Sequence, residues 1–297
     1  MSPPPDPGST GGPGRPEAGS PSPAVQLWLP IGLRSAPSFA NFVPGANAEA
    51  LHWVELLARG EGPEALYLWG GPGVGKTHLL EAACRDAAGR GEPVACVPLA
   101  GPEPLEPALL GGLESAALVC VDDLQAVAGG AAWEEALFHL MNALRATGGR
   151  LLLTGRAPVA ALGLTLPDLA SRVGAALVLH LAPLSDSERA AALRVRARER
   201  GFLLPDDVVE YLLRRFPRDL PTLVGLLDRL DEGSLAARRR VTLALVRELL
   251  DGAAAGSAGG GEKNLHEGVD TLRRVSKLRR SSGRLAATTD RGEEKGG

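Results

Sequence analysis

The stretch ALYLWGGPGVGKTHLLEAA at residues 65–83 decides the fold. Its first five residues are an apolar run followed by glycine, which predicts a buried strand, and residues 77–88 have helical apolar spacing. The residues that join them match the phosphate-binding pattern GxxxxGK(S/T); they are Gly70, Gly71, Pro72, Gly73, Val74, Gly75, Lys76 and Thr77. A strand, a glycine-rich loop and a helix in this order predict a P-loop, the alternative being a glycine-rich surface turn.

The chemistry of phosphate binding explains this spacing. Glycines let consecutive backbone N–H groups converge on phosphate oxygens, and the following helix presents its positive N-terminus to them. Lys76 is placed to reach the outer phosphates, and the Thr77 hydroxyl is placed to coordinate Mg²⁺. We therefore expect a nucleoside-triphosphate site.

A second strand supplies carboxylates for this site. The run LVCVDD at residues 118–123 has four apolar residues followed by Asp122 and Asp123. Asp122 is expected to bind Mg²⁺ through water, and Asp123 to orient the attacking water. Such a strand end is common by itself, but about 45 residues after a P-loop it supports the same site.

The remaining pattern predicts the fold class. Strands are expected at 93–99, 117–121, 150–154 and 176–181, and a helix at 133–146. After Ser185 the pattern is purely helical, with helices expected at 186–200, 206–216, 220–230 and 243–250. This alternation predicts an α/β fold, a parallel sheet covered by helices on both faces, followed by a small all-helical lid.

Composition narrows the classes of protein. A chain of 297 residues with 44% hydrophobic residues is long enough for two small packed domains, and its net charge of −3 excludes a globally basic nucleic-acid binder. Three cysteines without a CxxC pair predict reduced core thiols. Without a signal peptide or a run long enough to span a bilayer, we expect a soluble cytoplasmic protein with no membrane partner.

Taken together, these motifs resemble the AAA+ domain of the DnaA family, and more closely its Hda branch of DnaA-related regulatory inactivators. The resemblance covers residues 26–250. Besides the P-loop, it rests on DDLQAVAGGAAWEEALFHLMNAL at 122–144, LTG at 153–155, LPDLASRV at 166–173, LAPLSDSE at 181–188 and RGFLLPDDV at 200–208. DnaA carries a DNA-binding domain after its lid. Here the residues after 250 are too few and too polar for one, so we do not expect an initiator.

The segment before the predicted sheet suggests a partner. QLxLP resembles the peptide by which bacterial proteins dock on the sliding clamp of DNA polymerase III; the residues concerned are Gln26, Leu27, Leu29, Pro30 and Ile31. A polar anchor followed by apolar side chains on an unstructured leash suits an apolar groove. The alternative is a first strand that buries Leu27 and Leu29.

The resemblance also implies a division of the chain. Residues 1–24 are expected to be a disordered N-terminus, 25–37 the clamp-binding leash, 38–184 the AAA+ domain, 185–250 the lid, and 251–297 a flexible linker with a polar and basic tail. That tail is either solvated or a nucleic-acid contact.

Two further residue roles come from the resemblance. Arg172 stands where the family places an arginine finger, which reaches the phosphate held by a neighbouring molecule; the alternative is a surface arginine paired with Asp168. Phe42 and Val43 stand where the family cups adenine, the alternative being ordinary core packing. The five histidines show no metal-ligand spacing, and His78 and His139 are assigned packing roles.

Two positions depart from the family pattern. Pro221 replaces the second-sensor arginine of the lid, and Arg156 replaces the acid of the first sensor in Thr154-Gly155-Arg156. Both departures predict weak hydrolysis by the chain itself, with ADP or ATP and Mg²⁺ bound as a conformational ligand.

The leading hypothesis is a negative regulator of replication initiation. It docks on the clamp, contacts DNA only through the clamp at the replisome, and promotes hydrolysis of DnaA-bound ATP with Arg172. Homo-oligomers are compatible with this role. One alternative is a DNA-binding AAA+ ATPase of the helicase-loader or transposition-helper type, and another is a clamp scaffold that needs no nucleotide.

Overall fold

The computed structural model describes residues 36–101 and 105–255, with side chains as far as 250. Gln26 to Ile31 and the basic tail lie outside the described residues. The chain divides into two compact units, 1–231 and 232–297, and each is described by itself. The predicted limit between domains at residue 185 stays a prediction.

The first unit contains a five-stranded sheet in which every pairing is parallel. The strands are β1 Ala65–Trp69, β2 Val94–Pro98, β3 Leu118–Asp122, β4 Arg150–Gly155 and β5 Leu177–His180, in the order β2-β3-β4-β1-β5. Each lies within two residues of a predicted strand. The predicted fold class is confirmed.

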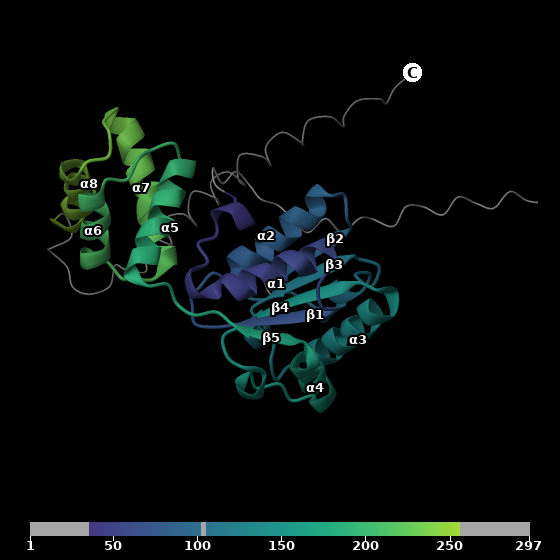
Figure 1. Cartoon of the computed structure of the whole chain (residues 1–297). Coiled ribbons are helices and arrows are strands. Elements are labelled where there is room, and N and C mark those ends of the chain that lie inside the picture. The colour runs from purple at the N-terminus through teal and green to yellow at the C-terminus, as the bar shows by residue number, and fades with distance from the viewer. Residues whose placement is uncertain (1–35, 102–104, 256–297) are drawn as a thin grey trace, which may run out of the picture. The chain divides into compact units, whose positions relative to one another are not determined.

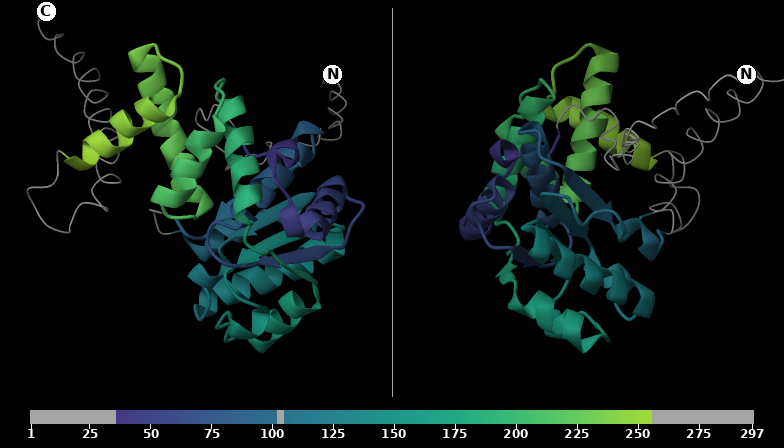
Figure 2. Two further views of the ribbon diagram at one scale, coloured as in Figure 1. Left: turned by 60° about the vertical axis from the view of Figure 1, so that its left-hand side comes forward. Right: turned by 90° about the vertical axis from the view of Figure 1, so that its right-hand side faces the viewer.

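Helices cover both faces of the sheet. On one face lie α1 Ala48–Arg59 and α2 Lys76–Gly89; on the other lie α3 Ala131–Thr147 and α4 Pro167–Ala175 (Figure 1). Figure 2 shows the same layers from two further sides. Along β1, Leu66 and Leu68 pack with the first pair of helices, whereas Tyr67 packs with the second. Side chains that alternate between faces thus build two apolar cores.

Further helices and turns complete the first unit. The lid helices are α5 Asp186–Glu199, α6 Asp206–Arg215 and the start of α7 Leu220–Ala237. Short 3-10 turns occupy Phe39–Asn41, Gly45–Asn47, Pro107–Leu110, Leu124–Ala126 and Val159–Ala161. Helix α5 begins with a capping box, in which Ser185 accepts from the Glu188 backbone and the Glu188 side chain accepts from Ser185. This local signal explains why the sequence predicts where α5 begins.

The second unit holds the end of α7 and helix α8, Leu243–Ala255. The carbonyl and hydroxyl of Thr242 accept from Val246 and Leu245 and so begin α8. At Gly233 an added Cβ would lie 2.3 Å from a methyl of Leu249, so the two helices approach closely there. Small size at this glycine permits the helical hairpin.

The cysteines are reduced, as the sequence predicts. Cys84, Cys96 and Cys120 are free thiols, of which Cys84 and Cys120 are buried. Across the ranges that the structure describes, no helix combines the length and the apolar character needed to cross a bilayer.

One fully buried carboxylate fixes the path between the two helices on the α3 face. Glu134, in the first turn of α3, accepts from the backbone of Gly129, Thr165 and Leu166 and from the Thr165 hydroxyl, at 2.6–3.1 Å. Burial opposes its ionisation, but these donors outweigh burial and lower the pKa of Glu134. Because residue 167 begins α4, Glu134 sets where that helix starts.

Replacing Glu134 by Gln should lower the free energy of unfolding by about 1–3 kcal/mol, because the new NH₂ group faces donors. Urea unfolding followed by circular dichroism measures this. Glu135→Gln, at the exposed neighbouring position on α3, is the matched control and should stay within about 0.5 kcal/mol of the parent. Equal effects of the two changes would contradict the role of Glu134.

Candidate functional site

The P-loop lies at the carboxyl end of β1, between β1 and α2. Gly70 N–H donates to the Gly155 carbonyl at 3.2 Å, which ties the start of the loop to the end of β4. Gly73 and Gly75 have φ of +73° and +103°. Because L-residues with side chains are strained there, these two glycines are needed for the loop conformation.

The same two glycines are closely covered. A Cβ on Gly73 would lie 2.8 Å from Pro221 Cδ at the start of α7, and a Cβ on Gly75 would lie 2.8 Å from the Phe42 ring. Phe42 therefore borders the loop and also packs on the core of the α1–α2 face, and its expected contact with adenine stays a prediction. Val43 follows it and is half-buried.

Lys76 is held against the loop. Its ammonium donates to the carbonyls of Gly70 and Gly71, both at 2.8 Å, and the residue is only 7% exposed. Burial lowers the pKa of Lys76 and the charge of Arg156 lowers it further, whereas Asp123 and Asp122 oppose the shift. A cation thus sits at the glycine cradle, as a phosphate site requires.

Asp122 joins three elements. One carboxylate oxygen accepts from the Thr77 hydroxyl of α2 at 2.7 Å, and the other accepts from the Thr154 hydroxyl of β4. Among the described residues, no three His, Cys, Asp or Glu side chains form a metal site. Mg²⁺, which binds one or two protein oxygens together with phosphates and waters, suits the pair Thr77 and Asp122.

A second set of contacts surrounds Asp123. Its backbone has φ of +61°, and its N–H donates to the Thr154 hydroxyl at 2.9 Å. Its carboxylate accepts from the Gln125 amide at 2.7 Å, and the Gln125 carbonyl oxygen accepts from the Arg156 N–H at 3.1 Å. Gln125 was not predicted as a site residue, although its position two residues after Asp123 was a signal.

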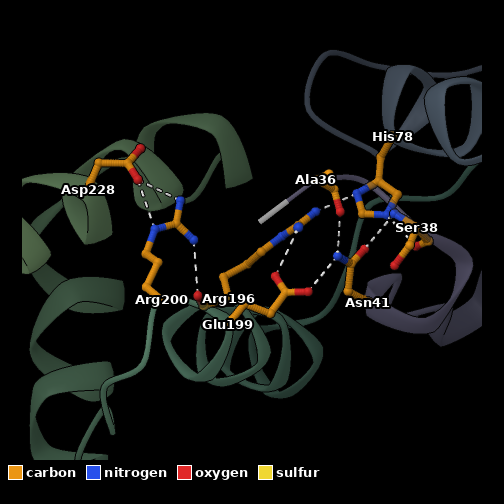
Figure 3. Close-up of polar contacts among 8 residues, drawn as sticks. All are labelled: Ala36, Ser38, Asn41, His78, Arg196, Glu199, Arg200 and Asp228. Carbon is orange, nitrogen blue, oxygen red and sulfur yellow. Dashed lines mark hydrogen bonds and ion pairs between the residues drawn. The ribbon is translucent and has the colours of Figure 1, made fainter. Parts of the chain in front are cut away.

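A polar network around His78 connects α2 with α5 (Figure 3). Arg196 of α5 donates to His78 Nδ1 at 2.6 Å, so His78 Nε2 carries the proton and donates to the Ser38 carbonyl at 2.9 Å. Burial, assisted by Arg196, lowers the pKa of His78 to about 4. His78 contacts the Phe42 ring, as expected of a packing residue, and also makes these hydrogen bonds.

The network continues into the segment at residues 36–41. Glu199 pairs with Arg196 at 3.2 Å and accepts from the Asn41 amide at 2.6 Å. Asn41 also donates to the Ala36 carbonyl and accepts from Ser38 N–H, both at 2.9 Å. Within the lid, Arg200 pairs with Asp228 of α7 (Figure 3). The segment beside the P-loop helix is therefore held by α5.

Arg172 lies elsewhere. On α4 it lines a pocket of about 270 Å³ together with Ala65, Leu151 and Leu177, which stand at the amino ends of β1, β4 and β5. The P-loop follows the opposite end of β1, roughly 13 Å away along the strand. Arg172 is half-buried, and within the described part of the chain it pairs neither with Asp168 nor with another acid.

The structure thus brings the P-loop, Asp122, Asp123 and Phe42 together at the carboxyl ends of the strands. It places Arg172 at the amino ends of the strands. A parallel sheet with a P-loop, an aspartate-ended strand and a helical lid is the arrangement of an AAA+ protein.

Comparison with solved structures agrees with this class. Domain III of Thermotoga maritima DnaA is 22% identical with a TM-score of 0.63, and the match covers 72% of this chain and 95% of that one. A DnaA structure bound to AMPPCP and single-stranded DNA is 18% identical (TM-score 0.55; 84% and 94% covered). The Thermotoga maritima RuvB branch-migration motor is also 18% identical (TM-score 0.55; 73% and 72% covered). These likenesses establish the fold.

The lid helices also match a protein-family model. Residues 186–250 match the family model for the lid domain of Hda. The lid of this chain therefore resembles that of Hda, and the chain shares the fold of DnaA domain III.

The free energy of unfolding should depend on His78 as the pH falls. The pKa of His78 is about 4 in the folded state, whereas the ordinary pKa of a histidine is 6.5. As the pH falls, the unfolded chain therefore takes up this proton before the folded chain does. Stability from His78 is complete above pH 6.5 and is lost between pH 6.5 and 4.

The measurement is the free energy of urea unfolding over this pH range. The free energy of unfolding of His78→Gln should fall less steeply with decreasing pH than that of the parent. For the exposed control His139→Gln, it should fall as steeply as for the parent. Parallel curves for the parent and His78→Gln would show that His78 titrates alike in both states.

Proposed function

We propose that this chain is a nucleotide-binding negative regulator of replication initiation. It docks on the polymerase sliding clamp through Gln26 to Ile31 and lends Arg172 to ATP-bound DnaA. The Hda-type lid and the DnaA domain III fold support the replication part of the proposal. The observation that carries the catalytic part is the position of Arg172.

Nucleotide binding is supported by the chemistry of the loop. The backbone N–H groups at residues 73–77 and the Lys76 ammonium suit phosphate, and Phe42 borders the loop where a base would follow. Thr77 and Asp122 would hold Mg²⁺ beside the phosphates, and Asp123 would position water. ADP and ATP are both ligands of such a site, and the DnaA relatives include AMPPCP-bound structures.

We infer that Arg172 acts on another molecule, because the P-loop of its own chain lies beyond its reach. A strand length separates it from Lys76, and no described acid holds its guanidinium. Placed against the nucleotide of a partner AAA+ module, that charge would stabilise the negative charge on the transferred phosphoryl group. Water attacks the γ-phosphorus, the β–γ bridging bond breaks, and ADP and phosphate leave.

Weak hydrolysis by the chain itself fits the residues at its own site. Pro221 packs where a lid arginine would approach Gly73, and proline brings no donor to a phosphate. The intact Lys76, Thr77 and Asp122 favour binding over turnover. The nucleotide then acts as a conformational ligand.

A DNA-acting ATPase is the second candidate, favoured by the fold shared with the RuvB motor and by the DnaA relative bound to single-stranded DNA. Single-stranded DNA would stimulate ATP hydrolysis by such an enzyme without a clamp or DnaA. A clamp scaffold of the nucleotide-independent kind would keep its full effect after Lys76→Ala.

Arg172→Ala should reduce the stimulated hydrolysis of DnaA-bound ATP by about 10²-fold or more, because the trans cation is lost. The assay follows radiolabelled ATP bound to DnaA, mixed with DNA-loaded clamp and this protein. Arg214→Ala, an exposed arginine on α6, is the control and should retain full stimulation. Full stimulation by Arg172→Ala would reject the arginine finger.

The double change Gln26→Ala and Leu29→Ala should weaken clamp binding by about tenfold or more, because both the polar anchor and an apolar side chain are removed. Surface plasmon resonance on immobilised clamp measures it, with Ser20→Ala and Ser22→Ala as the control. Unchanged clamp binding together with a lowered melting temperature would instead support the alternative, a first strand that buries Leu27 and Leu29.

A further inference from the structure

The loop between α7 and α8, residues 238–242, carries three successive arginines, Arg238, Arg239 and Arg240. All three are exposed, and the loop contains no acid. Arg239 pairs with Glu248 of α8 at 2.9 Å. Arg238 and Arg240 pair with no acid that the structure describes. Two unpaired cations therefore flank a paired one, in a protein whose net charge is −3.

Arg238 has a backbone conformation that disfavours arginine. Its φ is +51°, and the N–H groups of Arg238 and Arg239 close the end of α7 on carbonyls of its last turn, at 3.2 and 3.1 Å. Glycine is the usual residue at this position, and the chain itself places Gly60 after α1 and Gly148 after α3 in the same conformation. A side chain is strained there. An arginine at this position therefore has a use other than closing the helix.

The arginine loop is fixed to the helices on both sides. The Ser234 hydroxyl of α7 donates to the Arg239 carbonyl at 2.6 Å. Val241 is buried, and Thr242 begins α8 through the contacts described above. Because the backbone is already ordered, the two unpaired arginines lose little backbone freedom when they bind a partner.

Charge without apolar surface favours a nucleic-acid backbone over a protein surface as this partner. Protein–protein contacts depend on buried apolar or aromatic anchors, and Val241, the apolar residue of the loop, is buried. Leu235, in the last turn of α7, is 58% exposed, but a single exposed leucine is ordinary on a protein surface. Phosphates of DNA are bound by arginines without apolar contacts and without regard to sequence.

We propose that Arg238 and Arg240 bind the phosphate backbone of duplex DNA. The inference goes beyond the proposed function, in which the chain reaches DNA through the clamp, and adds a direct contact. A guanidinium offers two parallel donors to phosphate oxygens. Contacts with two phosphates are weak by themselves, but on a DNA-loaded clamp tethering raises the effective DNA concentration to about the millimolar range. A weak contact then suffices to orient the chain on the DNA.

The test is equilibrium binding of a fluorescently labelled duplex of mixed sequence to the full chain, followed by anisotropy at several salt concentrations. The double change Arg238→Gly and Arg240→Ala should weaken binding by about 3- to 30-fold at low salt. It should also reduce the slope of log K against log salt by about 2, because each phosphate contact contributes about 0.9. The basic residues at 273–284 are present in both proteins, so the difference reports on the loop.

The matched control removes the same charge elsewhere. Arg198 on α5 and Arg215 on α6 are exposed, and neither pairs with a described acid. The double change Arg198→Ala and Arg215→Ala should leave the affinity and the salt slope unchanged. An affinity and a slope equal to those of the parent in the Arg238→Gly and Arg240→Ala variant would overturn the inference.

Arg238→Gly by itself separates binding from folding. Because glycine relieves the strained backbone, this variant should melt about 2–4 °C above the parent, while its affinity for the duplex falls. A purely structural arginine would give the opposite sign. A melting temperature below that of the parent would therefore reject the role of Arg238 in binding.

Further measurements separate this inference from the proposed function. If the parent neither binds the clamp nor stimulates hydrolysis of DnaA-bound ATP, the proposed function fails, while duplex binding still tests the loop. If the Arg238→Gly and Arg240→Ala variant binds the duplex as the parent does but loses affinity for the clamp or for DnaA in the absence of DNA, the loop contacts an acidic protein surface. That result would reject the contact with DNA.

Discussion

The Asp122 carboxylate, buried and shared between two hydroxyls, is the contact on which the candidate site depends. It accepts from Thr77 on α2 and from Thr154 on β4, so it holds the P-loop helix and the adjacent strand to β3. A buried carboxylate without partners would be costly. These two donors, with Lys76 nearby, make its burial tolerable and fix the geometry of the phosphate cradle at the same time.

The same contact orders the residues on its outer side. Thr154 accepts from the Asp123 backbone while it donates to Asp122, and Asp123 in turn accepts from Gln125. Gln125 then fixes the backbone of Arg156. A chain of hydrogen bonds thus runs from the buried core to the exposed edge, and each polar group in it is satisfied by the next.

Much of the fold could be predicted from the sequence because its signals are local. Residues 65–69 form β1 as predicted, since an apolar run there ends in glycine. Helix α4 was not predicted, because it has nine residues and buries only Leu169 and Val173, which is too short for a periodic pattern. Helix α1 was also missed, although Gly60, with φ of +79°, ends it in the usual way.

The contacts of the site depend on long-range register, which local patterns do not contain. Thr77 meets Asp122 across 45 residues, and Arg196 meets His78 across 118. The motif predicted which residues belong near the phosphates, but the strand order β3-β4-β1 was needed to place Thr154, and after it Arg156, between them. For His78, a packing role was expected because its polar partners come from the distant helix α5.

The lid approaches the sheet domain through two unlike contacts, and neither needs a nucleotide. Pro221 of α7 packs on Gly73 through its ring, and Arg196 and Glu199 of α5 bind His78 and Asn41 through polar groups. A lid closed by an arginine on a phosphate would respond to phosphate number. Here α5 contacts instead the segment at residues 36–41, whose first two residues are the last two of the predicted leash. The position of α5 is therefore tied to that segment.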